Sequence, residues 1–496
     1  MVAQASILIV VIPLIAAFIC PLIGLWRRGL CYFWMVLALF VCTIASIDTL
    51  YAVIDGGTIH YKLGGWPPPF GIEYVVDHLN AMMLIVISVI SLIVAIYSKE
   101  SVEQELPQRS VYFYTVFLLQ VTGFLGIVIT GDLFNLYVFL EIASLAGYAL
   151  IAIGEDGAPL ACFRYIVMGT IGACFYLLGI GYIYVSTGSL NMADVQEILP
   201  GLYHSKVIVT AIAFLLAGLA VKMALFPVHV WLPDAYTKAP SAVSALVAPL
   251  MTKISLYVMI RILFSVFKPH LSIEMLPITQ IMVWAGFVAI CAGAIMALAQ
   301  KDFKRMLCYI VVAEVGYILG GVGLANTTAM KGAILHILND AVMTAGLFTV
   351  AGIIMYKVRS HNLSDFKGLF RKMPFTMAAF VVGALSIIGV PPTCGFFSKW
   401  YLIQGAVIAE QWAFVAALLG SSLINVILFF RIIEIGYGFH ESYGEHAHSS
   451  GGAMRIEEAP FSMLIPTLAV ALAIILIGFY NQTILSKIIQ FAVPKI

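Results

Sequence analysis

Ionisable side chains inside apolar runs are the residues of this sequence that could do chemistry, and the chemistry they suit is proton transfer. Lys222 and Lys253 lie in stretches that otherwise read as membrane-spanning helices. An ammonium at the centre of a bilayer costs about 2.5–3.5 kcal/mol on insertion scales, so it persists only beside an opposite charge or water. Glu141, in the apolar run 131–150, is the natural partner of Lys222. We predict that Glu141 sets the proton affinity of Lys222; the alternative is a static ion pair that holds two helices together.

Two lysines extend this pattern along the chain. Lys253 lies near the middle of its apolar run, four residues after Pro249, which argues against a side chain that snorkels to the interface. We predict that it receives a proton along a hydrated path. Lys399 follows a proline pair in GVPPTCGFFSKWYLI (389–403), where a loosened helix exposes carbonyl groups. It could end the path on the far side, or it could be an interfacial lysine beside Trp400.

The run KGAILHILNDAVMTAGLF (331–348) adds a histidine and an acid. His336 and Asp340 are four residues apart, so they share one helical face. Because histidine ordinarily titrates at about pH 6.5, His336 suits a proton relay, although it could also only donate a hydrogen bond between helices. Glu314, in YIVVAEVGYILGG (309–321), is a further buried carboxylate. It could pair with a lysine or bind a cation, and the sequence leaves both open.

A polar connection with three prolines, residues 226–240, separates the runs of the first two lysines. Each proline removes a backbone donor, so the helix must break here and other groups must satisfy the backbone. Broken helix beside buried charge is how many transporters line an ion path. His229 and Asp234 could form the cytoplasmic mouth of such a path, or they could cap the ends of the broken helix. Arg164 and Arg261 lie at span ends, where we expect them to snorkel.

Composition places these residues in a membrane protein. Of the 496 residues, 62% are hydrophobic and 10% charged, with a mean hydropathy of +1.04, which is far outside the range of soluble domains. The net charge of +1 argues against a nucleic-acid partner. Eight cysteines without a CxxC spacing make a disulfide framework, a zinc site or an iron–sulfur cluster improbable. With no Gly-rich phosphate loop and no nucleophile–base arrangement, we expect no catalytic chemistry and no cofactor in this chain.

Hydropathy predicts an all-α polytopic fold with about fourteen transmembrane helices, at roughly 20 residues per span. The predicted spans are 3–25, 30–53, 77–98, 111–130, 133–153, 160–186, 205–225, 241–267, 273–298, 304–323, 328–356, 375–401, 411–437 and 461–486. The first is expected to be a retained helix and not a signal peptide. Lysine and arginine concentrate in the loops 99–110, 299–305 and 357–374, which are therefore predicted to be cytoplasmic. Both termini are then predicted to lie outside.

Two loops between these spans need separate interpretation. Residues 54–76 are rich in turn formers and contain three consecutive prolines, so they are predicted to form an external loop. Residues 438–460 are polar and carry His440, His446 and His448. An HxH pattern can bind metal, but one short polar loop favours a solvated segment, and no metal site is predicted.

The order of these motifs resembles a known family. FPVHVWLPDAYTKAPSAVSAL (226–246), followed by a helix with Lys253, resembles the antiporter-like membrane subunits of respiratory complex I, Mrp cation/proton antiporters and membrane-bound hydrogenases. The sequence GDLFNLYVFLE (131–141) is most similar to the D-type subunit of Mrp antiporters. The resemblance implies two inverted five-helix repeats that contain broken helices. The implied organisation is 1–98 for helices 1–3, 111–267 and 273–437 for the two repeats, and 461–496 for helix 14.

The resemblance also assigns roles. It implies that Glu141 and Lys222 are an essential pair and that Lys399 is the terminal lysine of the path. Two positions depart from the family: Thr344 stands where relatives often have a lysine, and Glu314 where they tend to have a neutral polar residue. The long lateral helix of the largest members is expected to be absent.

The predicted function is proton translocation by one membrane subunit of a multisubunit complex in the cell membrane of a prokaryote. An Mrp-type Na⁺/H⁺ antiporter is the first expectation. A proton- or sodium-pumping subunit of a redox-driven complex (NADH-quinone oxidoreductase-like, hydrogenase or formate-oxidising) is the alternative. A structural subunit with a degenerate channel is the second alternative. The expected partners are other membrane subunits, lipid, protons and possible Na⁺, with no nucleic acid.

Overall fold

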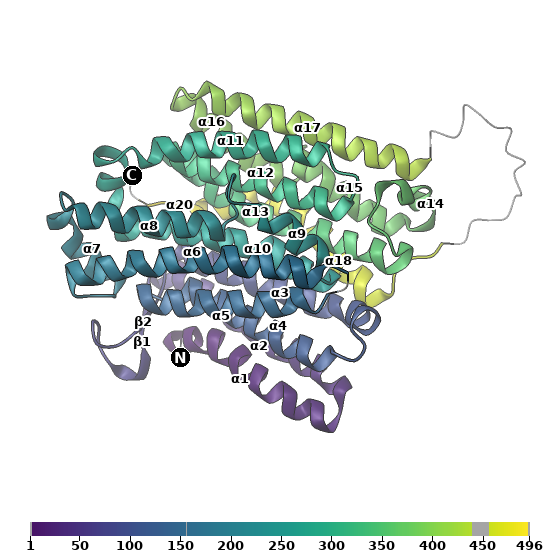
Figure 1. The fold of residues 1–496 in the computed structure, drawn as a ribbon, viewed down its shortest axis with the longest axis horizontal. Coiled ribbons are helices and arrows are strands. Elements are labelled where there is room, and N and C mark those ends of the chain that lie inside the picture. The colour runs from purple at the N-terminus through teal and green to yellow at the C-terminus, as the bar shows by residue number, and fades with distance from the viewer. Residues whose placement is uncertain (1, 155, 439–455, 495–496) are drawn as a thin grey trace, which may run out of the picture.

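The chain folds into a bundle of helices that run side by side, as Figure 1 shows for the computed structural model, which describes residues 2–154, 156–438 and 456–494. In these residues, twelve helices are long and apolar enough to cross a membrane. A helix satisfies its own backbone hydrogen bonds, which is why this architecture suits so apolar a sequence. The predicted class, an all-α polytopic membrane protein, is confirmed.

The twelve long helices follow the predicted spans closely. They are α1 (Val2–Trp26), α2 (Arg28–Gly56), α3 (His78–Glu105), α4 (Ser110–Ile129), α5 (Leu133–Ala152), α6 (Ala158–Thr187), α10 (Ser241–Ile260, continued by the π-helix η3, Arg261–Val266), α11 (Ile278–Leu298), α12 (Phe303–Gly323), α13 (Thr327–Val358), α17 (Trp412–Tyr437) and α18 (Phe461–Phe479).

The other two predicted spans, 205–225 and 375–401, are each divided into shorter helices. The first is α8 (Lys206–Lys222), followed after a turn by α9 (Trp231–Lys238). The second is α15 (Pro374–Ile388), followed by α16 (Cys394–Ile408). The breaks contain Pro227 and the pair Pro391–Pro392, which have no backbone N–H to continue a helix. The expectation of broken helices at these prolines is therefore confirmed, and the long spans among the described residues number twelve where about fourteen were expected.

Short elements connect the bundle. The strands β1 (Ile59–Lys62) and β2 (Glu73–Val76) form an antiparallel hairpin, with Ile59 opposite Val76 and Lys62 opposite Glu73, inside the loop that was predicted without strands. The remaining short helices are η1 (Leu63–Gly65), α7 (Met192–Ile198), η2 (Leu199–Leu202), η4 (His270–Met275), η5 (Leu363–Phe366), α14 (Leu369–Lys372), α19 (Asn481–Ile484), η7 (Leu485–Ile489) and α20 (Gln490–Ala492).

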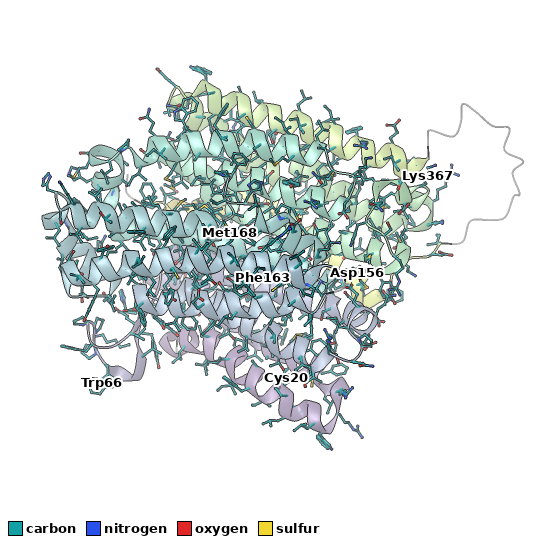
Figure 2. The ribbon with its side chains drawn as sticks, in the orientation of Figure 1. Cys20, Trp66, Asp156, Phe163, Met168 and Lys367 are labelled. Atoms are coloured by element: carbon teal, nitrogen blue, oxygen red, sulfur yellow. The ribbon has the colours of Figure 1, made fainter. Side chains whose placement is uncertain are left out.

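The two ends of the bundle carry different loops. Figure 2 places Trp66, in the hairpin loop, at one end and Lys367 and Asp156 at the opposite end. Helix α1 begins, and α20 ends, at the Trp66 end (Figure 1). This arrangement agrees with the predicted separation of the 54–76 and 357–374 loops and with termini on one side. The histidines His440, His446 and His448 lie outside the described residues, so the interpretation of their loop stays a prediction.

Three helices form the centre of the bundle. All residues of the apolar stretch of α10 are buried inside the protein, as are 94% of those of α12 and 89% of those of α13. In α1 the share is 33%, because most of that helix faces outward. Polar side chains in the apolar stretches of α10, α12 and α13 therefore lie mostly inside the protein.

Close helix packing supports this centre. Gly286 on α11 and Gly316 on α12 face each other, and a Cβ atom at either position would lie 2.7 or 2.8 Å from the other's carbonyl oxygen. Such a contact with backbone cannot be relieved by rotating a side chain. Small residues at a crossing are what allow two membrane helices to approach this closely.

We predict that Gly316→Val destabilises the chain by about 1–3 kcal/mol, the usual cost of overpacking, by pushing α11 and α12 apart. The measurement is the thermal unfolding temperature of the purified chain in detergent. Gly181→Val is the matched control, because a Cβ atom at Gly181 on α6 meets no atom within 4 Å. Equal unfolding temperatures for the two variants would contradict the predicted contact.

Candidate functional site

The structure brings Glu141 and Lys222 together between α5 and α8. Lys222 is the last residue of α8 and its side chain is 1% exposed. Its Nζ lies 3.6 Å from Glu141 Oε1 and donates a hydrogen bond to Ser144 Oγ at 2.7 Å. Ser144 lies one helical turn after Glu141 on the same helix. The lysine thus has a neutral acceptor in direct contact and a carboxylate just beyond hydrogen-bonding distance.

Lys253 forms a close and fully buried ion pair at the centre of the protein. Its Nζ lies 2.7 Å from Asp340 Oδ2, and neither side chain has any exposed surface. Asp340 also accepts a hydrogen bond from Thr344 Oγ1 at 2.8 Å. The pair joins α10 to α13, two of the three helices that are shielded from lipid. Asp340, which was predicted beside His336, is instead the partner of Lys253.

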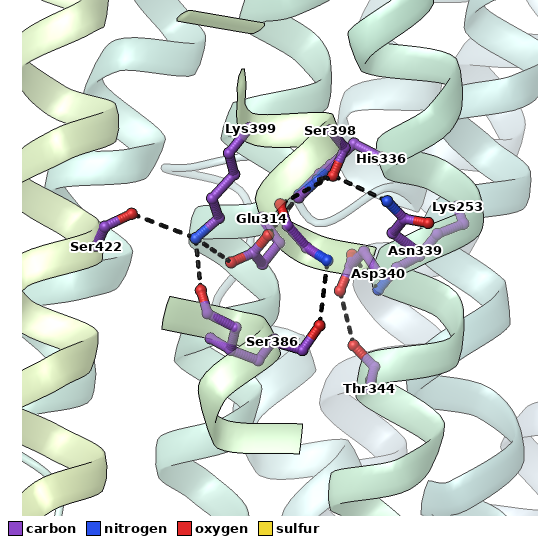
Figure 3. Close-up of polar contacts among 12 residues, drawn as sticks. Lys253, Glu314, His336, Asn339, Asp340, Thr344, Ser386, Ser398, Lys399 and Ser422 are labelled. Atoms are coloured by element: carbon purple, nitrogen blue, oxygen red, sulfur yellow. Dashed lines mark hydrogen bonds and ion pairs between the residues drawn. The ribbon is translucent and has the colours of Figure 1, made fainter. Parts of the chain in front are cut away.

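His336 and Glu314 form a third buried contact between titratable side chains. His336 Nε2 lies 2.5 Å from Glu314 Oε2, and its Nδ1 lies 2.8 Å from Ser398 Oγ. Asn339 Nδ2 donates to the same Ser398 oxygen at 3.1 Å, as Figure 3 shows. His336 and Asp340 are on one helix as predicted, but each turns to a different partner.

Lys399 lies inside the protein and not at the interface. Its side chain is 6% exposed, whereas the next residue, Trp400, points outward. Nζ of Lys399 donates to the carbonyl oxygen of Ile387 at 2.5 Å and lies 3.9 Å from Glu314 Oε1. It also lies 4.8 Å from the centre of the Tyr317 ring, within range of a cation–π contact. Glu314 therefore has His336 on one oxygen and Lys399 facing the other (Figure 3).

The predicted cytoplasmic mouth is held by ion pairs between helices. Asp234 on α9 lies 2.7 Å from Arg164 on α6 and 3.2 Å from Arg305 on α12. His229 is buried in the turn between α8 and α9, beside the rings of Phe226 and Tyr309. Its Nδ1 has no hydrogen-bond partner in the protein. Asp234 thus links α6 and α9 to α12, and His229 leaves a polar atom free to meet water or a proton.

The expectation that the span-end arginines only snorkel was wrong for two of them. Arg164 pairs with Asp234, and Arg261 is largely buried against Asp77, with contacts of 2.6 and 2.9 Å to its two oxygens. Burial raises the pKa of Asp77, but Arg261 and two backbone N–H groups outweigh it, so its pKa lies below the ordinary value. A bidentate pair of this kind fixes the end of α10 against the start of α3.

Two buried polar atoms without a protein hydrogen-bond partner belong to residues that adjoin charged residues in the sequence. Thr252 Oγ1 and Asn339 Oδ1 are buried and unpaired, and each belongs to the residue that directly precedes Lys253 or Asp340. Buried polar atoms need a hydrogen bond, and water is the partner that fits in such places. Both residues therefore have a polar atom that can accept or donate a hydrogen bond to water.

Sequence reasoning missed the neutral residues of the row. Ser144 could have been found, because it lies one helical turn after Glu141 and so shares its face. Asn339 could have been found in the same way, because it lies one helical turn after His336, whereas Ser398 carries no such signal, since only the fold brings it to His336 and Asn339. Among the described residues, no group of three or more His, Cys, Asp and Glu side chains is arranged to hold a metal ion.

We predict that Asp340→Leu destabilises the chain by about 3–5 kcal/mol, because it leaves the Lys253 ammonium buried without an anion. The double variant Lys253→Met with Asp340→Leu should recover most of that loss, since an apolar pair replaces an ion pair at similar volume. Thermal unfolding in detergent measures both. A double variant no more stable than the single one would contradict a direct pairing of these two groups.

Comparison with known proteins gives a consistent result for family. Residues 130–425 match the family described as "NADH:quinone oxidoreductase/Mrp antiporter, TM". The N-type subunit of the NADH-quinone oxidoreductase of Desulforudis audaxviator is 44% identical, over 100% of this chain and 99% of that protein. The D-type subunit of the Na⁺/H⁺ antiporter of Alkalihalophilus pseudofirmus is 31% identical, over 90% of this chain and 88% of that protein.

Solved structures agree with these relatives. A chain of the membrane-bound sulfane sulfur reductase, an archaeal respiratory membrane complex, superposes with a TM-score of 0.90 at 30% identity, covering 99% of this chain and 97% of that one. A chain of the Mrp complex from Dietzia sp. superposes with a TM-score of 0.87 at 25% identity and the same coverage. The superfamily predicted from the motifs is confirmed. The finer expectation, a particular likeness to D-type antiporter subunits, is not favoured, because the N-type oxidoreductase relative shares more of the sequence.

Proposed function

The chain belongs to the NADH:quinone oxidoreductase/Mrp antiporter family of membrane subunits, and from that premise we propose that it carries protons across a membrane as one subunit of a larger complex. The observation that carries the proposal is a row of buried acid–base contacts across the centre of the bundle. The row runs through Glu141–Lys222, Lys253–Asp340 and His336–Glu314–Lys399. Ionisable residues inside a membrane are expensive and mark ion paths when they face a protein interior.

The proposed route begins at the cytoplasmic side near His229 and Asp234. A proton reaches Lys222, whose affinity for it depends on Glu141, and passes to the central Lys253–Asp340 pair. From there it moves through His336 and leaves near Lys399. The unpaired polar atoms beside these groups support the route, because water bound to them would bridge the gaps between side chains.

Charge compensation supplies the driving principle. An opposite charge a few ångströms away shifts a pKa by about one to three units, so loosening one ion pair changes the proton affinity of its partner. The 3.6 Å and 3.9 Å separations at the two outer lysines are consistent with pairs that loosen more readily than the central one at 2.7 Å. A conformational change in the assembled complex that displaces one member of an ion pair would therefore change the proton affinity of the other member and move a proton.

The finer architecture belongs to the same proposal. Counting α8–α9 and α15–α16 each as one interrupted crossing, the chain crosses the membrane fourteen times, with both termini outside. Residues 111–267 and 273–437 would then be two inverted five-helix repeats, flanked by 1–98 and 461–496. The matched interruption of the fourth member of each repeat supports this division.

A redox-driven respiratory complex is the better supported assembly. The relative that shares 44% identity over its whole length bears the name of an NADH-quinone oxidoreductase subunit, and the 30% identical solved structure is from a respiratory complex. An Mrp-type Na⁺/H⁺ antiporter, the first expectation from the sequence, is the second candidate, on the 31% identity to a D-type antiporter subunit and the fold of the Mrp complex. A purely structural subunit is disfavoured by the retention of a carboxylate opposite each buried lysine of the row.

We predict that Lys222→Met and Glu141→Gln each abolish formation of a pH gradient in vesicles while the complex still assembles. Each change removes one ionisable partner and keeps most of the side-chain volume. Lys206→Met, at the exposed start of the same helix α8, is the control and should retain transport. Transport at the control level in both variants would end the proposal.

Purification of the intact complex tests which assembly the chain serves. For a redox-driven complex we expect co-purifying subunits with iron–sulfur or quinone-binding centres, and proton uptake that starts on adding a reductant. For an antiporter we expect only small membrane subunits, and proton movement that starts on imposing a Na⁺ gradient. The second pattern would overturn the preferred assignment.

A further inference from the structure

The starts of α5 and α12 are built alike, although they are far apart in the sequence. Asp132 caps α5 by accepting from Asn135 N at 2.7 Å, and Asp302 caps α12 by accepting from Arg305 N at 2.8 Å. Each aspartate also forms an isolated antiparallel bridge, to Asn191 or to Asn362. Two chain segments thus enter their helices through one and the same local structure.

The backbone around these bridges matches bond for bond. Leu133 N donates to Leu190 O, and Phe303 N donates to His361 O, at 2.9 and 2.8 Å. In return, Met192 N donates to Gly131 O and Leu363 N to Lys301 O, both at 2.9 Å. The paired segments are those that follow the next long helix in each case, α6 and α13. The match therefore covers two consecutive helices and not only one capping residue.

The two structures lie at opposite ends of the bundle. The start of α5 contacts the hairpin end, where Gly131 N donates to Glu73 O. The start of α12 contacts the other end, where Lys304 Nζ donates to Ala239 O at the end of α9. Equivalent structures at opposite ends are what an inverted repeat produces. On this correspondence α5 is the counterpart of α12, and the interrupted α8–α9 is the counterpart of α15–α16.

The correspondence extends to the charged residues. Each of α5 and α12 carries one buried or half-buried glutamate, and each interrupted crossing carries one lysine that faces it, at 3.6 and 3.9 Å. In both pairs the glutamate's Oε1 faces the lysine without a hydrogen bond. Both lysines are also associated with the C-terminal end of the first half-helix, although they come from opposite sides of the break: Lys222 is the last residue of α8, and Lys399, on α16, donates to Ile387 O in the last turn of α15. A helix C-terminus favours a cation there.

We infer that Glu314 is a proton-binding site of the second repeat, on the helix that corresponds to the helix of Glu141 but about one turn farther from its capping aspartate, and that it passes protons from His336 to Lys399. This inference rests on the proposed function and goes beyond it, because it gives the second repeat its own carboxylate–lysine site. The charged and titratable groups around Glu314 are His336 on α13, Lys399 on α16, Lys253 on α10 and Tyr317 on α12 itself. Only the first two are in direct line with its oxygens.

The transfer balances as two proton steps. A doubly protonated His336 gives the proton on Nε2 to Glu314 Oε2, which leaves a neutral imidazole and a carboxylic acid. The acid then gives its proton to a neutral Lys399 amine, which leaves a carboxylate and an ammonium. Because the proton is then on Oε2 whereas Oε1 faces Nζ at 3.9 Å, the second step needs the carboxyl group to rotate so that the protonated oxygen faces Lys399, and either the amine to approach or one water to bridge the remaining gap.

The test compares Glu314→Gln, Glu314→Asp and Lys222→Met in the intact complex in vesicles. Glutamine keeps the size and hydrogen bonds of Glu314 but cannot carry a proton. We expect Glu314→Gln to assemble and to slow proton translocation by roughly 100-fold or more, the loss typical of a missing proton-transfer group. Glu314→Asp should retain transport with an altered pH profile. If Glu314→Gln fails to assemble, the Glu314→Asp pH profile decides, and a profile identical to wild type overturns the inference.

The outcomes separate this inference from the proposed function. If Lys222→Met stops transport while Glu314→Gln transports like wild type, then Glu314 only links helices and the inference is overturned, while the proposed function stands. If Lys222→Met transports like wild type, the proposed function itself fails. If both variants stop transport, and Glu314→Gln also removes a protonated-carboxyl band from infrared difference spectra, the inference is supported.

Discussion

A charge that is taken out of water must meet an opposite charge, and the centre of this protein is arranged around that requirement. Of the four buried lysines among the described residues, three each face one carboxylate: Lys222 faces Glu141, Lys253 faces Asp340 and Lys399 faces Glu314. Burying an ion without such a partner costs several kcal/mol. In these three pairs each positive charge has a negative partner. Gain or loss of one proton would therefore leave one charge without its partner.

The three pairs are not equivalent, and the difference follows from where they lie. The central pair is in direct contact between two continuous helices that are shielded from lipid. Lys222 ends the helix before one break, and Lys399 reaches back from α16 to the other break, where carbonyl groups left without helical partners can accept from an ammonium, as Ile387 O does from Lys399. An outer lysine held by a neutral acceptor can exchange its carboxylate partner at lower cost. The prolines in these breaks therefore both end helices and leave backbone carbonyl groups free to accept hydrogen bonds.

The packing of the bundle explains how the row stays isolated from the membrane. Helices α10, α12 and α13 carry the central groups and are almost wholly enclosed, while α1, α6 and α17 present apolar residues outward. Close approach of α11 to α12 through Gly286 and Gly316 helps to exclude lipid from the side of Glu314. Family membership fits this construction, since the solved relatives share the fold over nearly the whole chain.

Residue types and their spacing were enough to predict the class of fold, the positions of the long helices and several of the buried ionisable residues, although not the buried Lys304. Apolar run length sets helix length, proline removes the donor a helix needs, and a lysine in such a run is conspicuous whatever its partner. The choice of partners came from packing in three dimensions. Asp340 pairs with Lys253 and not with His336. A helix places many side chains on one face, and the packing of α10 and α16 around α13 determines which neighbour each of them contacts. Pairing between side chains from distant segments depends on that packing, and the local periodicity of the sequence does not predict it.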